Sequence, residues 1–298
     1  MTSTLADKLR TKRFVVTTEL TPPKGVDLGD IFAKADLLKP CVDAMNLTES
    51  PRARMAIEPK SVAHLLIDRG VEPIVQVTAR DRNRIAVQAD LLGAAALGVA
   101  NFVFMTGDSP KKGDHPDAKP VFDLTTTDML NAARALAAGR DLAGNELKGA
   151  PHLFIGATAN PGAADLAAEI ENTRRKIEAG AQFLQTQAVF DIGVVERYVQ
   201  AARLGEVALL AGIIPLKSAK MAAWLNANVP GIRVPHALLA EMHAAAEAGR
   251  EEEVGLDIAI RLVRGLRGVA DGVHLMALGW EAHIPRILRE AGVRDCAA

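Results

Sequence analysis

The chain of 298 residues is poor in aromatic side chains and in cysteine. Phe, Trp and Tyr make up 4% of the sequence, whereas hydrophobic residues make up 49%, so we expect an aliphatic interior. Cys41 and Cys296 lie far apart and lack the spacing of a metal site. The sequence nominates no disulfide partner for either cysteine, and a reducing, cytoplasmic environment is therefore expected.

Charge of one sign and long apolar runs are also lacking. The 35 Lys and Arg residues are balanced by 36 Asp and Glu residues, which argues against a nucleic-acid or membrane-surface partner. No apolar run approaches the ~18 residues of a membrane-spanning helix, and the N-terminus lacks the apolar core of a signal peptide. These features predict an intracellular protein that does not enter a membrane.

Several motifs of known catalytic classes are missing. The sequence has no His or Cys/His set for zinc, no Ser-His-Asp order with a nucleophile elbow, no Walker loop and no G-x-G-x-x-G after its first expected strand. We therefore predict no metal site. The chemistry is expected to rest on carboxylates and amides instead.

Short runs typical of buried strands alternate with helical segments along the whole chain. The strands are expected at 14–20, 42–48, 72–78, 102–105, 152–156, 182–187, 208–214 and 272–276. Helices are expected at 31–38, 59–69, 82–97, 126–137, 166–179 and 281–290, with two or three more after Pro215. Without a linker, this alternation predicts an α/β fold, a single-domain (βα)8 TIM barrel over 1–298 with loose termini at 1–12 and 293–298. A doubly wound open sheet is the alternative.

Polar residues follow the carboxyl ends of the expected strands. The stretch from Asn101 to Pro110 is typical, because a buried strand ends in Thr-Gly-Asp and a proline then prevents further pairing. In a barrel all such ends share one rim. The residues expected there are Glu19, Thr48, Gln76, Thr78, Asp108, Asn160, Gln185 and Gln187.

Two carboxylates and several amides on an apolar frame predict an enzyme that uses acid/base chemistry on a polar heterocyclic or carbonyl substrate. Each residue alone also has a structural explanation. Asp108 could close a turn, Glu19 could be a solvated strand end, and Arg175 with Lys176 could form a solvated helix face.

A series of short motifs adds to this interpretation. They are T-E-L-T-P-P around Glu19, N-L-T-E around Thr48, Q-V-T-A-R-D-R-N from Gln76, T-G-D-S-P around Asp108, R-R-K-I-E-A-G-A from Arg174, Q-T-Q-A-V-F-D ending at Asp191, G-I-I-P-L-K-S from Gly212 and H-L-M-A-L-G-W-E from His274. Each motif is weak alone. In this order, over residues 14–292, they resemble the methylenetetrahydrofolate reductase family in its short bacterial, catalytic-barrel form.

The resemblance implies a flavoprotein that binds FAD at the strand ends and takes electrons from NADH or NADPH. Its substrate would be a reduced folate, 5,10-methylenetetrahydrofolate, which is reduced to 5-methyltetrahydrofolate. Glu19 matches the general acid that protonates N10 of this substrate and so opens its five-membered ring. Asp108 matches the aspartate between flavin and folate, and Gln187 matches the amide that contacts folate and nicotinamide in turn.

The resemblance also implies binding residues. The flavin contacts would be Thr48, Gln76, Thr106, Gly107, Asp108, Phe122, Asn160, Glu169, Asn172, Arg175 and Lys176, the last two on the diphosphate. The substrate contacts would be Asp108, Gln187, Met221 and Trp280. The chain departs from the enterobacterial pattern, which has Gln at Met221, Arg at Trp280, His at Gln76, Arg at Thr106, Tyr at Gly156 and Phe at Leu225.

These departures leave two alternatives open. One is hydride transfer from NAD(P)H directly to a methylene-tetrahydropterin, without flavin. The other is a folate-binding subunit that works with a partner reductase. A homo-oligomer is compatible with each of these hypotheses.

Overall fold

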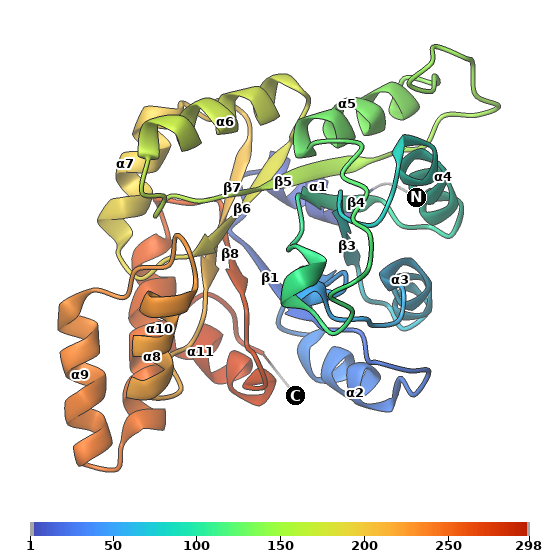
Figure 1. The fold of residues 1–298 in the computed structure, drawn as a ribbon. Helices are drawn as coiled ribbons and strands as arrows, with labels where there is room; N and C mark the ends of the chain where they lie inside the picture. The colour runs from blue at the N-terminus through green and yellow to red at the C-terminus, as the bar shows by residue number, and fades with distance from the viewer. Residues whose placement is uncertain (1–2, 297–298) are drawn as a thin grey trace.

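The computed structural model describes residues 3–296, which form a closed barrel of parallel strands surrounded by helices (Figure 1). The strands are β1 (Val15–Leu20), β2 (Ala44–Leu47), β3 (Pro73–Thr78), β4 (Asn101–Met105), β5 (Phe154–Ala159), β6 (Phe183–Ala188), β7 (Ala208–Ile213) and β8 (Gly272–Leu275). They neighbour one another in chain order, and β8 closes the ring by pairing with β1. The predicted TIM barrel is confirmed, and the open sheet is excluded.

The helices lie outside the strands, as a barrel requires (Figure 1). They are α2 (Gly29–Leu38), α3 (Pro59–Ile67), α4 (Arg84–Ala96), α5 (Thr126–Ala137), α6 (Leu166–Glu178), α7 (Ile192–Ala202), α8 (Ala219–Asn228), α9 (His236–Glu247), α10 (Glu251–Leu266) and α11 (Ile284–Glu290). Short 3-10 turns occur at η1 (Pro51–Ala53), η2 (Pro110–Lys112) and η3 (Glu281–His283). Helix α5 has the predicted range, whereas α7 has no counterpart in the sequence prediction.

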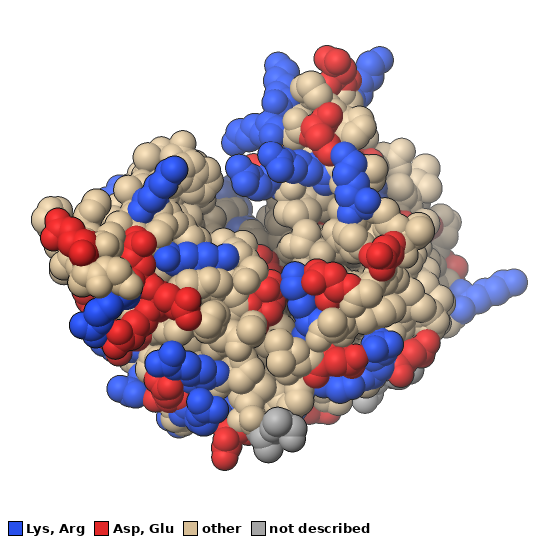
Figure 2. Space-filling view, turned by 90° about the horizontal axis from the view of Figure 1, so that it is seen from below, with Lys and Arg blue, Asp and Glu red and all other residues tan. Residues whose placement is uncertain are grey.

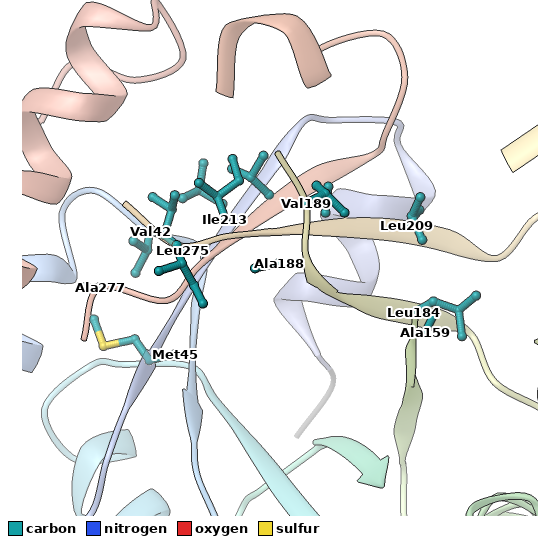
Figure 3. Close-up of a cluster of buried hydrophobic side chains, with 14 of the residues drawn as sticks. Val42, Met45, Ala159, Leu184, Ala188, Val189, Leu209, Ile213, Leu275 and Ala277 are labelled. Carbon is teal, nitrogen blue, oxygen red and sulfur yellow. The ribbon is translucent and has the colours of Figure 1, made fainter. Parts of the chain in front are cut away.

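Aliphatic side chains fill the layer between strands and helices. Figure 3 shows part of this core, in which Met45, Leu184, Leu209 and Leu275 are each at most 1% exposed. The strands can be short because both of their faces are buried. Among residues 3–296, no helix has the length and apolarity needed to cross a bilayer.

The N-terminal segment is ordered, which contradicts the prediction of a loose terminus at 1–12. Residues Thr4–Arg10 form helix α1, and its Leu5 and Leu9 pack with side chains inside the barrel such as Val15 and Phe183. Glu72 holds the start of the helix by accepting a hydrogen bond from the Leu5 amide at 3.0 Å. Because α1 fills the amino-terminal end of the barrel, the carboxyl-terminal end is left for ligands. Residues 1–2 lie outside the described residues.

The C-terminal segment is also held, which corrects the expectation for 293–296. Arg294 forms an ion pair with Asp43, with Nη2 2.8 Å from Oδ2. Cys296 is disulfide-bonded to Cys41, and their Cα atoms are 5.0 Å apart. The sequence nominates no partner for either cysteine, because a separation of 255 residues hides this pairing. Residues 297–298 lie outside the described residues.

Candidate functional site

A cavity of about 500 Å³ opens at the carboxyl ends of the strands. Its lining residues are Glu19, Gln76, Met105, Thr106, Thr125, Thr126, Thr127, Thr158, Ala159, Asn160, Glu169, Asn172, Lys176, Gln185, Thr186, Gln187, His274 and Met276. Residues from β1, β3, β4, β5, β6 and β8 meet here. This is the convergence that the sequence predicts for parallel strand ends.

Glu19 stands beside a buried histidine. Its Oε2 atom lies 3.7 Å from Nε2 of His274 on β8, and its side chain is 17% exposed. Nδ1 of the same ring is 3.0 Å from the hydroxyl of Thr17, which is His274's neighbour across the β1–β8 pair. The Thr17 hydroxyl therefore holds the His274 ring, and its Nε2 faces the Glu19 carboxyl group.

An amide pair lies beside this histidine. Asn46 Nδ2 donates to Gln185 Oε1 at 2.6 Å and lies 3.5 Å from His274 Nε2. Asn46 and Gln185 are both buried. These side chains, with Thr17 and His274, form a buried polar network next to Glu19, and such a network fixes side-chain positions when its members are paired.

An irregularity in β6 shapes the wall that carries Gln185. Gln185, Thr186 and Gln187 all line the cavity, although consecutive strand residues normally point to opposite faces. The register against β7 shifts between Gln185 and Ala188, and the Thr186 hydroxyl accepts a hydrogen bond from the Gly212 amide at 2.8 Å. Bulges of this kind redirect side chains next to active sites. The strand pattern in the sequence does not reveal this shift.

Helix α6 contributes a buried cation to the cavity. Lys176 is only 6% exposed, and its Nζ donates to the Thr158 carbonyl at 2.7 Å. Burial lowers the pKa of the Lys176 ammonium, and the negative charge of Glu169 partly opposes this shift. Glu169 is itself fixed, because it accepts hydrogen bonds from the backbone amide of Asn160 at 2.9 Å and from the side-chain Nδ2 of Asn172 at 3.2 Å.

Not every predicted site residue lines this cavity. Thr48, Gly107, Asp108, Phe122, Arg175, Met221 and Trp280 lie outside the lining. The Asp108 side chain is 46% exposed and lies 3.8 Å from Lys112 Nζ. Thr78 is turned toward Glu49, which accepts hydrogen bonds from its amide and its hydroxyl. The site roles of these residues remain predictions.

The turn that carries Asp108 requires glycine at position 107. Gly107 has φ +85°, and an added Cβ there would lie 2.9 Å from Thr78 Cβ. Only glycine combines this left-handed backbone with such a close approach. The turn therefore directs Asp108 outward from β4, and the sequence motif Thr-Gly-Asp is explained by packing.

Sequence reasoning missed His274, Thr17, Asn46 and the three threonines at 125–127. A signal for His274 was present, because a histidine within the buried run 272–276 needs a polar partner. Thr125 caps α5, and threonines 125–127 place the amino terminus of that helix at the cavity. A carboxylate of the chain already occupies this terminus, because Asp128 accepts hydrogen bonds from the amide and the hydroxyl of Thr125.

Comparison with known proteins gives a family match. The family model described as methylenetetrahydrofolate reductase matches residues 4–292. A Caenorhabditis elegans protein, a probable methylenetetrahydrofolate reductase (NADPH), is 23% identical over 240 residues, which cover 78% of this chain and 34% of that protein. The chain thus spans about a third of the length of this relative.

Solved structures support the fold. EDTA monooxygenase from Chelativorans sp. BNC1 has a TM-score of 0.61 at 12% identity, covering 94% of this chain and 93% of that one. A 2,3-dimethylmalate lyase has a TM-score of 0.53 at 13% identity, and the match covers 98% of this chain and 87% of the lyase chain. At such low identities these likenesses concern the barrel alone.

Proposed function

Because the chain belongs to the methylenetetrahydrofolate reductase family, a family of oxidoreductases, we propose that it reduces 5,10-methylenetetrahydrofolate to 5-methyltetrahydrofolate with electrons from NADH or NADPH. The observation that carries the proposal is the position of Glu19, a half-buried carboxyl group on the cavity beside His274. Opening the bridged ring of the substrate needs a proton donor at this kind of position.

The roles of the chain's residues follow from their places in the cavity. Glu19 protonates N10 of the substrate, which turns this nitrogen into a leaving group and leaves an electrophilic carbon. His274 positions Glu19 and can return its proton. Gln187 offers an amide to the ring system of the substrate. Asp108 stays at the rim, where its charge can stabilise the cation that forms.

The family implies FAD, and the donors around the cavity fit this group. Lys176 suits a diphosphate, while Gln76, Asn160 and Asn172 offer amides. The Asn160 Oδ1 atom is buried and has no hydrogen-bond partner among the described residues, so it is available to a ligand. Flavin bound by these residues would supply the hydride.

Direct hydride transfer from the nicotinamide remains a second candidate. It is favoured by the position of several expected flavin contacts, including Arg175 and Phe122, outside the cavity lining. The absorbance spectrum of the purified protein separates the two candidates. A flavin spectrum supports the first, and folate-dependent NAD(P)H oxidation by a colourless protein supports the second.

The decisive variant is Glu19→Gln. We expect it to lower folate turnover by roughly 10²–10⁴-fold, the usual contribution of a general acid. Reduction of menadione by NAD(P)H should survive if flavin is bound, because that reaction does not need the proton. Both rates are measured at saturating NAD(P)H.

Glu146→Gln is the matched control, since Glu146 lies on a surface loop with its side chain 79% exposed. Unchanged folate turnover in Glu19→Gln would remove the proposed role of Glu19. Loss of both reactions in Glu19→Gln, with both retained in the control, would show that Glu19 is needed for something other than the proton transfer.

A further inference from the structure

Two side chains from different loops meet across the mouth of the barrel. The guanidinium carbon of Arg52 in η1 lies 5.8 Å from the centre of the Trp224 ring in α8. Segment η1 follows β2 and helix α8 follows β7, so the strands between them in the ring are β8 and β1. Those two strands carry His274 and Glu19. The contact therefore crosses the mouth on the side of the proposed acid.

Beside this contact lies a second cavity of about 760 Å³. It begins at Thr21, two residues beyond Glu19, and Arg52 and Arg54 both line it. It is thus continuous along the chain with the end of β1. Glu19 and Thr21 thus place the two cavities within two residues of each other along the chain.

The acidic residues of this second cavity already have partners. Asp114 pairs with Lys24 at 2.6 Å, and Asp30 pairs with Lys34 at 2.9 Å. Asp27 accepts a hydrogen bond from the amide of Gly29 at 3.0 Å.

The two arginines differ from these acids. Both Arg52 and Arg54 are exposed, and within residues 3–296 neither is paired with a carboxylate. Among the lining side chains without an oppositely charged partner, the two arginines outnumber Asp27, whose carboxylate is met only by the Gly29 amide, so one net positive charge is left over. Figure 2 shows Lys and Arg side chains gathered at the border of a hollow near the top of that view.

The backbone holds Arg52 in an unusual conformation. Ser50, Arg52 and Ala53 have φ values of 39°, 57° and 55°, which residues other than glycine rarely adopt. The segment is packed tightly, because a Cβ at Gly113 would lie 1.7 Å from the Ala53 carbonyl oxygen. Strained backbone that is retained in a loop at a binding site often fixes a functional side chain.

Trp224 lies outside the lining of the second cavity but next to it, because its ring contacts Arg52, which does line the cavity. Its side chain is 45% exposed, whereas the adjacent Leu225 is 3% exposed and belongs to the core. Trp280 packs against His283, with ring centres 5.0 Å apart. Lys217 is also engaged, since its ammonium donates to the Leu278 carbonyl. Trp224 and the two arginines are the groups that remain available.

We propose that Arg52, Arg54 and Trp224 bind the tail of the substrate, an aromatic ring followed by glutamate carboxylates. The inference rests on the proposed function, because it assigns the anionic tail of the same folate. The tail's ring lies against Trp224, and its carboxylates accept hydrogen bonds from the two guanidinium groups. Arginine suits this role because its planar donors match a carboxylate.

The test is calorimetric binding to the purified full-length chain. The ligands are 5-methyltetrahydrofolate with one glutamate, the same compound with three glutamates, and a 5-methyltetrahydropterin without a tail. We expect Arg52→Ala to weaken binding of the monoglutamate about tenfold, as for a lost charged hydrogen bond. In the double variant Arg52→Ala/Arg54→Ala, the affinity for the triglutamate should fall more than the affinity for the monoglutamate. The tail-free pterin should bind all variants equally.

Two further variants sharpen the result. Trp224→Phe should retain most of the affinity for the monoglutamate, whereas Trp224→Ala should not. Arg13→Ala is the matched control, because Arg13 is exposed just before β1, at the opposite end of the barrel. It should leave all three affinities unchanged. Higher salt should weaken tail binding in the wild type more than in Arg52→Ala.

Each contrary outcome has a distinct meaning. If the wild type binds no folate, the proposed function fails and this inference fails with it. If the wild type binds folate and Arg52→Ala/Arg54→Ala binds it equally well, the tail site alone is wrong. If the variants instead raise the KM for NAD(P)H and leave folate binding intact, the arginines serve the dinucleotide phosphates, and the proposal is overturned.

Discussion

Lys176 is a single residue of the candidate site whose buried charge lowers the stability of the fold. An ammonium group that is 6% exposed loses most of its hydration, and it is compensated by the Thr158 carbonyl and by the nearby charge of Glu169. Burial therefore lowers its pKa from the ordinary 10.5. We propose that this cation also holds an anionic group of a ligand in the cavity.

We expect Lys176→Met to weaken binding of ADP, used as a diphosphate probe, about tenfold while raising the free energy of unfolding by up to about 1 kcal/mol at neutral pH. The stability is expected to rise because the pKa of Lys176 is lower in the folded state than in the unfolded chain. The buried charge therefore costs stability below the folded-state pKa, and the cost disappears as the pH rises through it.

Calorimetric ADP binding and urea unfolding at about pH 7 and about pH 10 measure these effects. The stability advantage of Lys176→Met over the wild type should shrink at the higher pH. Equal ADP affinity in the two proteins would show that Lys176 does not face the ligand.

At the scale of the element, one buried carboxylate just before strand β2 holds helix α1 and the C-terminal segment in place. Asp43, just before β2, is buried and accepts a hydrogen bond from the Val16 amide at 2.9 Å. Lys8 of α1 lies 2.9 Å from one of its oxygens, and Arg294 lies 2.8 Å from the other. One carboxylate thus joins both terminal segments to the barrel.

We expect Asp43→Asn to lower the free energy of unfolding by about 2–3 kcal/mol at neutral pH, because two cations would lose their partner. Burial raises the pKa of Asp43, but hydrogen bonds from Arg294, the Val16 amide and Lys8, together with the charge of Arg294, outweigh it, so the net pKa lies below 3.8. The stabilisation is therefore present above pH 3.8 and lost as the pH falls through the lowered folded-state pKa.

Urea unfolding at neutral and acid pH tests this expectation. The difference between the wild type and Asp43→Asn should narrow in acid. Asp30→Asn is a suitable control, because the Asp30 side chain is 81% exposed and its ion pair with Lys34 contributes little. An Asp43→Asn protein as stable as this control would mean that the terminal segments do not depend on Asp43.

For the whole molecule, the main consequence of ring closure is that distant segments become neighbours. Strand β8 pairs with β1, and the chain beyond α11 then reaches the segment before β2, where Cys296 bonds to Cys41. A cross-link that spans 255 residues removes much conformational freedom from the unfolded chain.

We expect the oxidised protein to be about 2–4 kcal/mol more stable than Cys296→Ser under non-reducing conditions. Adding a reductant should remove this difference, because the wild type then loses the same cross-link. Unfolding by guanidinium chloride with and without dithiothreitol measures it, and a thiol titration confirms the redox state. A wild type whose stability does not respond to reductant would contradict this expectation.

Local patterns were sufficient to predict the barrel and part of the site. The strands at 14–20 and 72–78 were recognisable because buried strands are apolar and end in turn residues, and the helix at 126–137 was predicted with the bounds of α5. Glu19, Gln76, Asn160 and Gln187 could be brought together in advance, since parallel strands in a barrel end at one rim.

The remaining features depend on contacts between residues that are distant in sequence. The register shift in β6, the insertion of α1 into the barrel, the Cys41–Cys296 bond and the Arg52–Trp224 contact all arise this way. Periodicity reports which face of a segment is buried, but not which distant partner buries it. The residue types and their order thus set the architecture and the proposed acid, whereas packing between remote segments set the cavity's walls and the site that we assign to the tail.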